Sequence, residues 1–485
     1  MPRRLTADHP ADLFDVAATR RLERAAAQAL PPHTLMRRAG LAVARLAMAL
    51  APDARCIWIA CGPGNNGGDG LEAALALHER GFAPVVTLCA DPARLPPDAA
   101  QALARAQAAG IPIAATPPDR FDLGIDALLG IGAARAPAGD MAQWLSRLYG
   151  GSAPLLSVDL PSGLDADTGA AQFDFGAAPH ARHARHCLSL LTLKPGLFTG
   201  HGRDAAGEVW FDDLGVAAVA EAPIARRSGA PAEQARAHAA HKGSFGDVAV
   251  IGGAPGMAGA ALLAASAALH HGAGRVYVGL LDASAPLLDP SQPELMLRRA
   301  DAFPLEAMTV VCGCGGGDAV RAHLPRVLAS APRLVLDADA LNAVAQDTAL
   351  QALLAQRHAR GWATVLTPHP LEAARLAALD TVQVQARRLE VAHNLARRFG
   401  AVVVLKGSGT VVAAEGETPF INPTGNARLA TAGTGDVLAG MIGAALASGQ
   451  PAFEAARDAV WRHGAAADHW PQGSALTAGA LARAN

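Results

Sequence analysis

Residues 56–80 open with Cys56-Ile-Trp-Ile-Ala-Cys-Gly-Pro-Gly-Asn-Asn-Gly-Gly-Asp-Gly70 and continue into an Ala- and Leu-rich segment. The apolar run is typical of a buried strand, and the segment after the glycines has the spacing of an amphipathic helix. A glycine-rich turn between a strand and a helix directs backbone N–H groups and a helix N-terminus at one point, which suits a phosphate. The stretch therefore predicts an α/β fold with a ligand site at the turn.

The same alternation of apolar runs and amphipathic stretches extends from Arg55 to Asp159. It predicts a parallel sheet with helices on both faces, the pattern of a Rossmann-like three-layer α/β/α domain. Two more helices are predicted before this series, over residues 13–51, and a weaker strand pattern follows it.

A second series of strands and helices begins at Gly246, after a change in composition. Residues 217–240 are rich in Ala, Pro, Arg and His and have no sustained apolar periodicity, which is typical of a linker. We therefore predict two α/β domains, residues 1–222 and 241–485, with a linker over residues 223–240.

The overall composition argues against several classes of function. The chain has 485 residues, 51% of them hydrophobic, and a formal net charge of −2, which argues against a broad basic surface for nucleic acid or anionic lipid. Apolar stretches such as Val437–Ala447 are shorter than the ~18–20 residues that cross a bilayer. The six cysteines have neither zinc spacing nor the density of a disulfide scaffold. We expect a cytoplasmic protein with no membrane or nucleic-acid partner.

Polar residues stand at the predicted ends of several strands in the first domain. Asn66, Asp126, Asp159 and Ser162 should converge outside the carboxyl ends of a parallel sheet, where ligands bind in such folds. A single Asp at a strand end is usually a cap, but the combination indicates a site. Their oxygen atoms suit an alkali cation better than a soft metal.

The second domain has its densest signal at Gly433-Thr-Gly-Asp436, which opens an apolar helix. Backbone N–H groups and the helix dipole would form an anion hole there. Asp436 alone would be interpreted as a helix cap. However, Lys406-Gly-Ser-Gly-Thr410 follows a predicted strand and could wrap around and bind a nucleotide. Only Lys194, Lys242 and Lys406 are lysine among 41 basic residues, and we expect a functional role for Lys406.

The first domain resembles the NAD(P)H-hydrate epimerases in residues 62–70, in Asp126-Ala-Leu-Leu-Gly-Ile-Gly132 and in Val158-Asp-Leu-Pro-Ser-Gly-Leu-Asp165. Leu35-Met-Arg-Arg-Ala-Gly40 and Lys194-Pro-Gly-Leu197 extend the resemblance over about residues 13–215. The resemblance implies a catalytic role for Asp159 and a potassium ion bound by Asn66, Asp126 and Ser162. The residues implied to bind the hydrated nicotinamide nucleotide are Asn65, Asn66, Gly67, Gly68, Asp69, Gly130, Ile131, Gly132, Ala133, Ala134, Arg135, Ala136 and Asp159. The family usually has Thr at the position of Ile131 and an acidic residue at that of Arg37.

The second domain is similar to the ribokinase superfamily in its Gly-x-Gly-Asp motif, whose Asp accepts a proton from a substrate hydroxyl. Within that superfamily, His241-Lys-Gly-Ser-Phe-Gly246, residues 252–260, Thr367-Pro-His-Pro370 and residues 430–440 resemble the ADP- or ATP-dependent NAD(P)H-hydrate dehydratases, over about residues 241–479. The implied contacts to the hydrate come from Gly259, Gly317, His369 and Asp436. The implied nucleotide contacts come from Lys406, Gly407, Ser408, Gly409, Thr410 and Gly435, with Mg²⁺ on the phosphates. Gly313-Cys-Gly-Gly-Gly317 stands where the family has Gly-Pro-Gly-Leu-Gly.

Together the resemblances imply a metabolite-repair enzyme for NADH and NADPH hydrated at the nicotinamide ring. The first domain would epimerise the (R)-hydrate to the (S)-hydrate. The second would phosphorylate the ring hydroxyl from ADP or ATP, with Asp436 as base, after which loss of phosphate restores the ring. The expected partners are these small molecules, and the expected assembly is a homo-oligomer.

One alternative is a ribokinase-type kinase of a hydroxyalkyl heterocycle, fused to a non-catalytic nucleotide-binding or scaffold domain. Such a kinase would release a stable phosphorylated product, so product analysis separates the two hypotheses. The presence of Asp126, Asp159 and the full Asn65–Asp69 run argues against a silent first domain.

Overall fold

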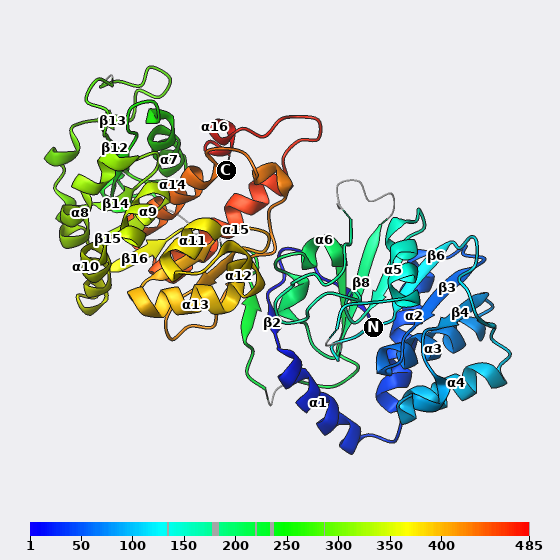
Figure 1. The fold of residues 1–485 in the computed structure, drawn as a ribbon. Coiled ribbons are helices and arrows are strands. Elements are labelled where there is room, and N and C mark those ends of the chain that lie inside the picture. Colours follow the sequence, from blue (N-terminus) through cyan, green and yellow to red (C-terminus); the bar gives the residue numbers. More distant parts are fainter. Residues whose placement is uncertain (133–134, 177–183, 219–220, 233–236, 286, 485) are drawn as a thin grey trace. The chain divides into compact units, whose positions relative to one another are not determined.

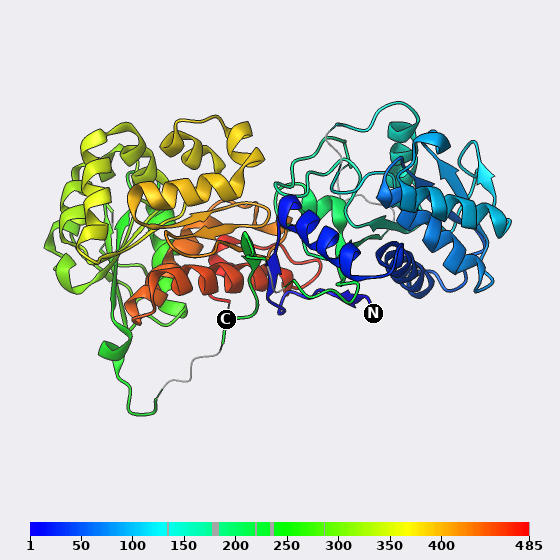
Figure 2. The ribbon, with the colours of Figure 1, turned by 90° about the horizontal axis from the view of Figure 1, so that it is seen from below.

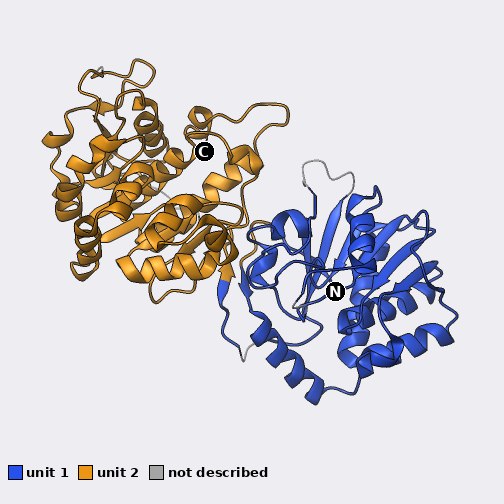
Figure 3. Ribbon diagram, viewed as in Figure 1, with its two compact units in different colours: residues 1–6, 11–225 blue, residues 7–10, 226–485 orange. Residues whose placement is uncertain are grey.

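The computed structural model describes residues 1–132, 135–176, 184–218, 221–232, 237–285 and 287–484. The chain divides into two compact units, residues 1–6 with 11–225 and residues 7–10 with 226–485 (Figure 3). Each unit has a mainly parallel sheet with helices on both faces, so the predicted α/β class is confirmed for both.

The sheet of the first unit has the strand order β1-β9-β8-β7-β6-β3-β4-β5. Its neighbouring strands are parallel except for β1 and β9, which are antiparallel. The strands are β1 (Arg3–Arg4), β3 (Ile57–Cys61), β4 (Pro84–Leu88), β5 (Ile113–Ala114), β6 (Leu123–Ala127), β7 (Leu155–Val158), β8 (Arg185–Leu190) and β9 (Glu208–Asp212); β2 (Ala11–Leu13) precedes the first helix. The helices are α1 (Val16–Ala29), α2 (Thr34–Leu50), α3 (Asn65–His78), α4 (Pro97–Ala108), α5 (Asp140–Gly150) and α6 (Gly202–Ala206).

Alternation along β3 shows how this sheet separates two helical layers. Ile57, Ile59 and Cys61 belong to a core that includes residues of α2, α3 and α4. Trp58 points the other way, where its indole donates to Thr87 Oγ1 at 2.8 Å and lies under the guanidinium of Arg147 on α5. Successive side chains of a strand alternate between faces, so one apolar strand serves both cores.

The sheet of the second unit has the order β13-β12-β11-β14-β15-β16-β17-β18-β19-β10. The strands are parallel except that β18 is antiparallel to both β17 and β19. The strands are β10 (Ala225–Arg227), β11 (Asp247–Gly252), β12 (Arg275–Leu280), β13 (Met296–Leu297), β14 (Thr309–Cys312), β15 (Arg333–Leu336), β16 (Ala363–Leu366), β17 (Val402–Leu405), β18 (Val411–Ala413) and β19 (Phe420–Ile421). The helices are α7 (Ala258–His270), α8 (Leu324–Ser330), α9 (Ala338–Gln346), α10 (Thr348–Ala359), α11 (Pro370–Ala377), α12 (Thr381–Ala386), α13 (Arg388–Phe399), α14 (Thr434–Ala447), α15 (Ala452–Asp468) and α16 (Ala478–Leu481).

Two buried cores lie on the two faces of this second sheet. Val248 and Val250 of β11 pack with α7 and α14 to α16, whereas Ala249 and Ile251 pack with α8 to α13. In Figure 2 the yellow helices lie on one side of the orange strands, and the red helix α15 lies on the other. The second unit is therefore also a three-layer α/β/α sandwich.

The segment predicted to be a linker contains a strand. Ala225–Arg227 form β10, which pairs with β19 through Arg226 N–H to Pro419 O at 2.8 Å and Ser228 N–H to Ile421 O at 3.0 Å. Residues 7–10 also belong to the second unit, where the buried Arg227 donates to His9 O. A strand this short has no periodicity of its own, so its formation depends on the partner strand.

We expect this strand to stabilise the second unit. A fragment of residues 223–485 retains β10, whereas a fragment of residues 241–485 exposes the edge of β19 and loses two backbone hydrogen bonds, worth about 1–3 kcal/mol together. The shorter fragment should melt a few degrees lower, at about 2–4 °C per kcal/mol for a domain of this size. Calorimetry of both fragments checks this; equal melting temperatures would show that β10 contributes nothing.

Candidate functional site

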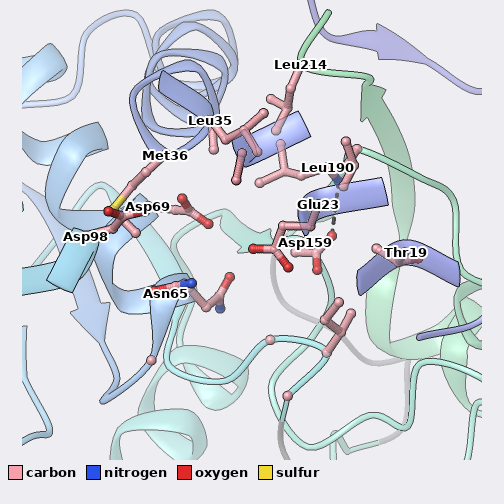
Figure 4. Close-up of a pocket in the computed structure, with 18 of the residues that line it drawn as sticks. Thr19, Glu23, Leu35, Met36, Asn65, Asp69, Asp98, Asp159, Leu190 and Leu214 are labelled. Atoms are coloured by element: carbon pink, nitrogen blue, oxygen red, sulfur yellow. Dashed lines mark hydrogen bonds between the residues drawn. The ribbon is translucent and has the colours of Figure 1, made fainter. Parts of the chain in front are cut away.

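The first unit has a cavity of about 670 Å³ at the point where its strand order reverses. From β3 the chain continues outward through β4 and β5, then returns to the other side of β3 with β6. Open α/β sheets bind ligands at such a switch point. The cavity is lined by Pro63–Asn66 after β3, by Leu128–Gly132 after β6, and by residues of α1 and α2 (Figure 4).

Glycines allow the two loops at this switch point to approach each other. A Cβ at Gly62 would lie 1.7 Å from Leu128 O, and one at Gly67 would lie 2.1 Å from Gly62 O. Both positions exclude any side chain, because these are backbone contacts that cannot move aside. The glycine pattern in the sequence therefore reflects the packing of this loop as well as ligand binding.

Asp159 lies at the cavity wall directly after β7, with a left-handed φ of +68°. Its Oδ1 accepts from Leu190 N at 3.1 Å and from the ammonium of Lys194. Lys194 is fully buried and also donates to Leu190 O at 2.7 Å. Oδ2 of Asp159 has no hydrogen-bond partner among the described residues. The buried ammonium thus fixes one carboxylate oxygen and leaves the other for a ligand.

Besides Asp159, the carboxyl groups of Glu23, Asp69 and Asp98 line this cavity (Figure 4). Burial, followed by the charge of Asp159, raises the pKa of Glu23 on α1. Burial and the charges of Asp159 and Glu23 raise the pKa of Asp69 on α3 well above its usual range. The lysine-paired carboxylate of Asp159 therefore shares the cavity with carboxyl groups whose pKa values are raised, an arrangement that suits acid–base chemistry.

Asn66, Asp126 and Ser162 come together beside the cavity. Asp126 accepts from Ser162 Oγ at 2.6 Å and from Ser162 N at 2.9 Å, and Ser162 Oγ accepts from Leu129 N at 2.8 Å. The side chain of Asn66 packs near Gly130, and its buried Oδ1 and Nδ2 have no hydrogen-bond partner among the residues that the structure describes. Burial raises the pKa of Asp126 to about 6. The orphaned amide oxygen and the buried carboxylate fit a hard cation such as potassium, which prefers oxygen ligands.

The other predicted residues of the first unit divide into three groups. Asn65, Gly130, Ile131 and Gly132 line the cavity. Gly67, Gly68, Arg135 and Ala136 do not line it; Gly68 instead packs against Met36. Ala133 and Ala134 lie outside the described residues. Among the residues at this site, Lys194 is marked in the sequence only by the rarity of lysine, which assigns it no role, and no sequence pattern marks Glu23.

The strand order of the second unit reverses between β11 and β14. The loops after these strands join through Gly253 N–H to Cys314 O at 3.0 Å and Ala254 N–H to Gly315 O at 2.7 Å. Gly317 follows with a φ of +49°, and its N–H donates to Asp339 Oδ2 at 2.8 Å. Gly259, in the first turn of α7, has open space where a side chain would be.

Lys406 follows β17 and forms an ion pair with Asp337, which follows β15, at 2.8 Å. Asp337 Oδ1 also accepts from Thr367 Oγ1 at 2.8 Å. Burial works to lower the pKa of Lys406, but the charges of Asp337 and Glu372 outweigh it and the pKa is raised. A Cβ at Gly435 would lie 3.1 Å from Lys406 Nζ, so this cation adjoins the start of α14. The predicted Lys406 and Gly435 are brought together, and Asp337 is a partner that the sequence reasoning missed.

Asp436 stands in the first turn of α14 but does not cap it. Among the described residues its carboxylate accepts from the Cys314 thiol and from no backbone N–H of that helix. Burial, followed by the charge of Asp337, raises its pKa to about 6. The geometry thus disfavours the capping interpretation, because the cap residue is Gly433 and the carboxylate faces Asp337 and Cys314.

His369, in contrast, is a helix cap. Its Nδ1 accepts from Leu371 N at 3.1 Å and from Glu372 N at 3.3 Å, and Glu372 accepts from His369 N at 2.8 Å. Burial, followed by the charge of Lys406, lowers the pKa of His369. Its ring therefore already has a structural role at the start of α11.

The turn from Gly407 to Thr410 is held by a residue that the sequence reasoning missed. Arg388 of α13 is buried and donates to Leu405 O, Lys406 O and Gly409 O at 3.1–3.4 Å. Gly407, with a φ of +132°, packs on this guanidinium, and Ser408 is exposed. The turn is therefore fixed in shape with its outer surface open to a ligand.

The carboxylates of the second site are also candidate ligands for magnesium. Ligand atoms of Cys314, Asp337 and Asp436 lie within 4.8 Å of one another in the described part of the chain. Mg²⁺ takes one or two carboxylates together with phosphate oxygens, so the two aspartates fit such an ion and the thiol does not.

No helix in the described residues is long and apolar enough to cross a membrane.

Comparison with known proteins gives matches for both units. Residues 32–196 match the family described as YjeF-related protein N-terminus, and residues 248–484 match the family described as NAD(P)H-hydrate dehydratase. The bifunctional NAD(P)H-hydrate repair enzyme of Escherichia coli is 39% identical over 471 residues, which cover 93% of this chain and 88% of that protein. The ADP-dependent (S)-NAD(P)H-hydrate dehydratase of Neisseria meningitidis is 45% identical over 257 residues, which cover 51% of this chain and 85% of that protein. A solved ADP/ATP-dependent NAD(P)H-hydrate dehydratase from Bacillus subtilis, co-crystallised with ATP and Mg²⁺, aligns with a TM-score of 0.44 and 33% identity over 51% of this chain and 90% of that chain.

Proposed function

This chain belongs to the family of bifunctional NAD(P)H-hydrate repair enzymes, and on that premise we propose that it restores NADH and NADPH hydrated at the nicotinamide ring. The first unit interconverts the (R)- and (S)-hydrates, and the second dehydrates the (S)-hydrate with ADP or ATP. The observation that carries the proposal is that one chain has both switch-point sites, each with a lysine–aspartate ion pair. A dehydratase for one epimer leaves the other behind, so both sites are needed to clear the mixture.

In the first unit, Asp159 moves a proton at the hydroxylated carbon while that carbon loses and regains its configuration. The free Oδ2 of its lysine-paired carboxylate supports this role, since a base must reach the reacting proton directly. The polar loops at Asn65 and Gly130–Gly132 contact the nucleotide at the helix N-terminus of α3, where backbone N–H groups favour phosphate.

In the second unit, Asp436 accepts the proton of the ring hydroxyl as that oxygen attacks the terminal phosphoryl group. Backbone N–H groups of Gly433–Gly435 stabilise the developing negative charge. Lys406 and the turn to Thr410 hold the adenine nucleotide, with Gly259 and Gly317 beside the hydrate. Asp337 and Asp436 would hold Mg²⁺, which would supply positive charge beside the phosphates. Loss of phosphate, driven by the ring nitrogen, then restores the dihydronicotinamide.

Potassium in the first unit would be held by Asn66, Asp126 and Ser162 and would supply positive charge near the substrate phosphates. We expect potassium to raise the melting temperature relative to tetramethylammonium at equal ionic strength. An ion at a hundredfold excess over its Kd contributes about 2.7 kcal/mol. Asp126→Asn should remove most of this increment.

The matched control for potassium is Asp53→Asn, which changes an exposed aspartate outside the cavity. Thermal unfolding in both salts checks all three proteins. An increment that persists in Asp126→Asn would place the ion elsewhere.

The test of the whole proposal is incubation with an epimeric NADPH-hydrate mixture and ADP or ATP, followed by the absorbance of the restored dihydronicotinamide. We expect complete recovery and release of inorganic phosphate. A stable phosphorylated product would indicate a kinase instead, and no recovery with either nucleotide would contradict the proposal.

A further inference from the structure

We propose that Glu23 is a second catalytic residue of the first site and works with Asp159 as an acid–base pair that opens and recloses the hydrated ring. The inference rests on the proposed epimerase activity and assigns the group that exchanges a proton with the ring nitrogen. Glu23 lies 136 residues before Asp159 in the sequence, yet both carboxyl groups line the same cavity (Figure 4).

Helix α1 is tied to the segment that holds Asp159. Asp15 caps α1 by accepting from Ala18 N at 2.6 Å, and Val16 N donates to Asp167 at 2.9 Å. One turn before Glu23, Thr19 Oγ1 hydrogen-bonds Thr192 Oγ1 at 2.7 Å. Thr192 lies in the turn between Leu190 and Lys194, both of which contact Asp159. Since residues i and i+4 share a helix face, Thr19 fixes the side of α1 that presents Glu23 to the cavity.

The carboxyl group of Glu23 does not help to hold the described part of the fold together. In the part of the chain that the structure describes, it makes no hydrogen bond or ion pair, although it is half-buried. A glutamate there loses hydration without a partner in return, which is costly unless a ligand supplies one. The charged groups that interact with it are Asp69, Asp159, Lys194 and its helix neighbours Arg20 and Arg24, and burial, followed by the Asp159 charge, raises its pKa. The proposal therefore assigns the role of acid to Glu23 and the role of base to Asp159, whose carboxylate is paired with Lys194.

Opening of the hydrated ring uses one acid and one base at neighbouring atoms of the substrate. Dihydronicotinamide is an enamine, so water adds with its hydroxyl on the carbon bonded to the ring nitrogen. That carbon carries an oxygen and a nitrogen as neighbouring atoms. The carboxyl groups of Glu23 and Asp159 line one cavity and interact electrostatically, so together they can serve these two neighbouring atoms.

In the proposed step, every proton and electron pair that moves is returned within one turnover. Asp159 Oδ2 takes the hydroxyl proton, the carbon–nitrogen bond breaks with its electron pair passing to nitrogen, and nitrogen takes the proton of Glu23. The carbon becomes an aldehyde, and rotation about its carbon–carbon bond presents the opposite face. Nitrogen then attacks, returning its proton to Glu23, and the oxygen recovers its proton from Asp159. Both residues end in their starting protonation states.

The test is Glu23→Gln in the full-length protein, which keeps the side-chain size but cannot transfer a proton. We expect the epimerase kcat to fall about 10²–10⁴-fold, with KM, melting temperature and dehydratase rate unchanged. The matched control is Glu79→Gln, at an exposed glutamate outside the cavity, which should leave every value unchanged. An unchanged kcat, or a loss confined to KM or melting temperature, would overturn the catalytic role.

A second measurement checks the ring-opening step. Wild-type epimerisation in ¹⁸O-labelled water should invert the carbon while its oxygen is retained, because the hydroxyl never leaves. One solvent oxygen incorporated per inversion would overturn ring opening. If the wild-type protein does not interconvert the epimers faster than buffer, the proposed function fails before the variant is considered.

Discussion

Asp436→Asn should lower the rate of (S)-hydrate dehydration about 10²–10⁴-fold, the contribution of one positioned base. The carboxylate makes no capping bond to α14, so the nearly isosteric amide leaves folding intact. Adenine-nucleotide binding should persist because Lys406 and the turn to Thr410 are unchanged. Epimerisation in the first unit should be unaffected. Turnover, nucleotide affinity and melting temperature measured on one preparation check these expectations.

The control for Asp436 is an aspartate that does cap a helix. Asp380 accepts from Gln383 N at 2.7 Å, and Asp380→Ala should cost about 0.5–2 kcal/mol of stability with normal turnover. The pH profile gives a second check: a base with a pKa of about 6 is protonated below that pH, so wild-type dehydration should fall about tenfold per pH unit below 6. A destabilised but fully active Asp436→Asn would remove this residue from the mechanism.

Asp159→Asn should abolish epimerisation and leave dehydration in place. The structure adds an effect on stability, because Lys194 is fully buried and loses its counter-charge. An uncompensated buried charge costs about 3–5 kcal/mol, so the melting temperature of the first unit should also fall. Stereochemical exchange between the hydrates and calorimetry of the same variant measure both effects.

The double variant Asp159→Asn with Lys194→Met separates chemistry from folding. Removing both charges should restore most of the lost stability, since a neutral pair has no unpaired charge to bury. Epimerisation should remain absent because the proton acceptor is still missing. A double variant that regains epimerisation would show that Asp159 acts only through stability.

The architecture followed from local patterns. Apolar runs alternating with amphipathic stretches predicted both α/β/α units, because strand and helix periodicities are encoded over a few residues. The glycine-rich loops at residues 62–70 and 433–436 predicted the regions where the sites lie, because such turns are needed wherever backbones approach closely. The short strand β10 has neither signal, so the sequence indicated a linker at its position.

The pairings within the sites were decided only by the tertiary structure. Lys194 meets Asp159 across 35 residues and Lys406 meets Asp337 across 69, and neither spacing has any local periodicity. Glu23 reaches the first site because α1 is bonded to the turn at Thr192, and Asp436 faces a thiol rather than its own helix. The residue types and loop positions are properties of the sequence, whereas partner, burial and charge state depend on strand order and on which helix covers the switch point, which are non-local.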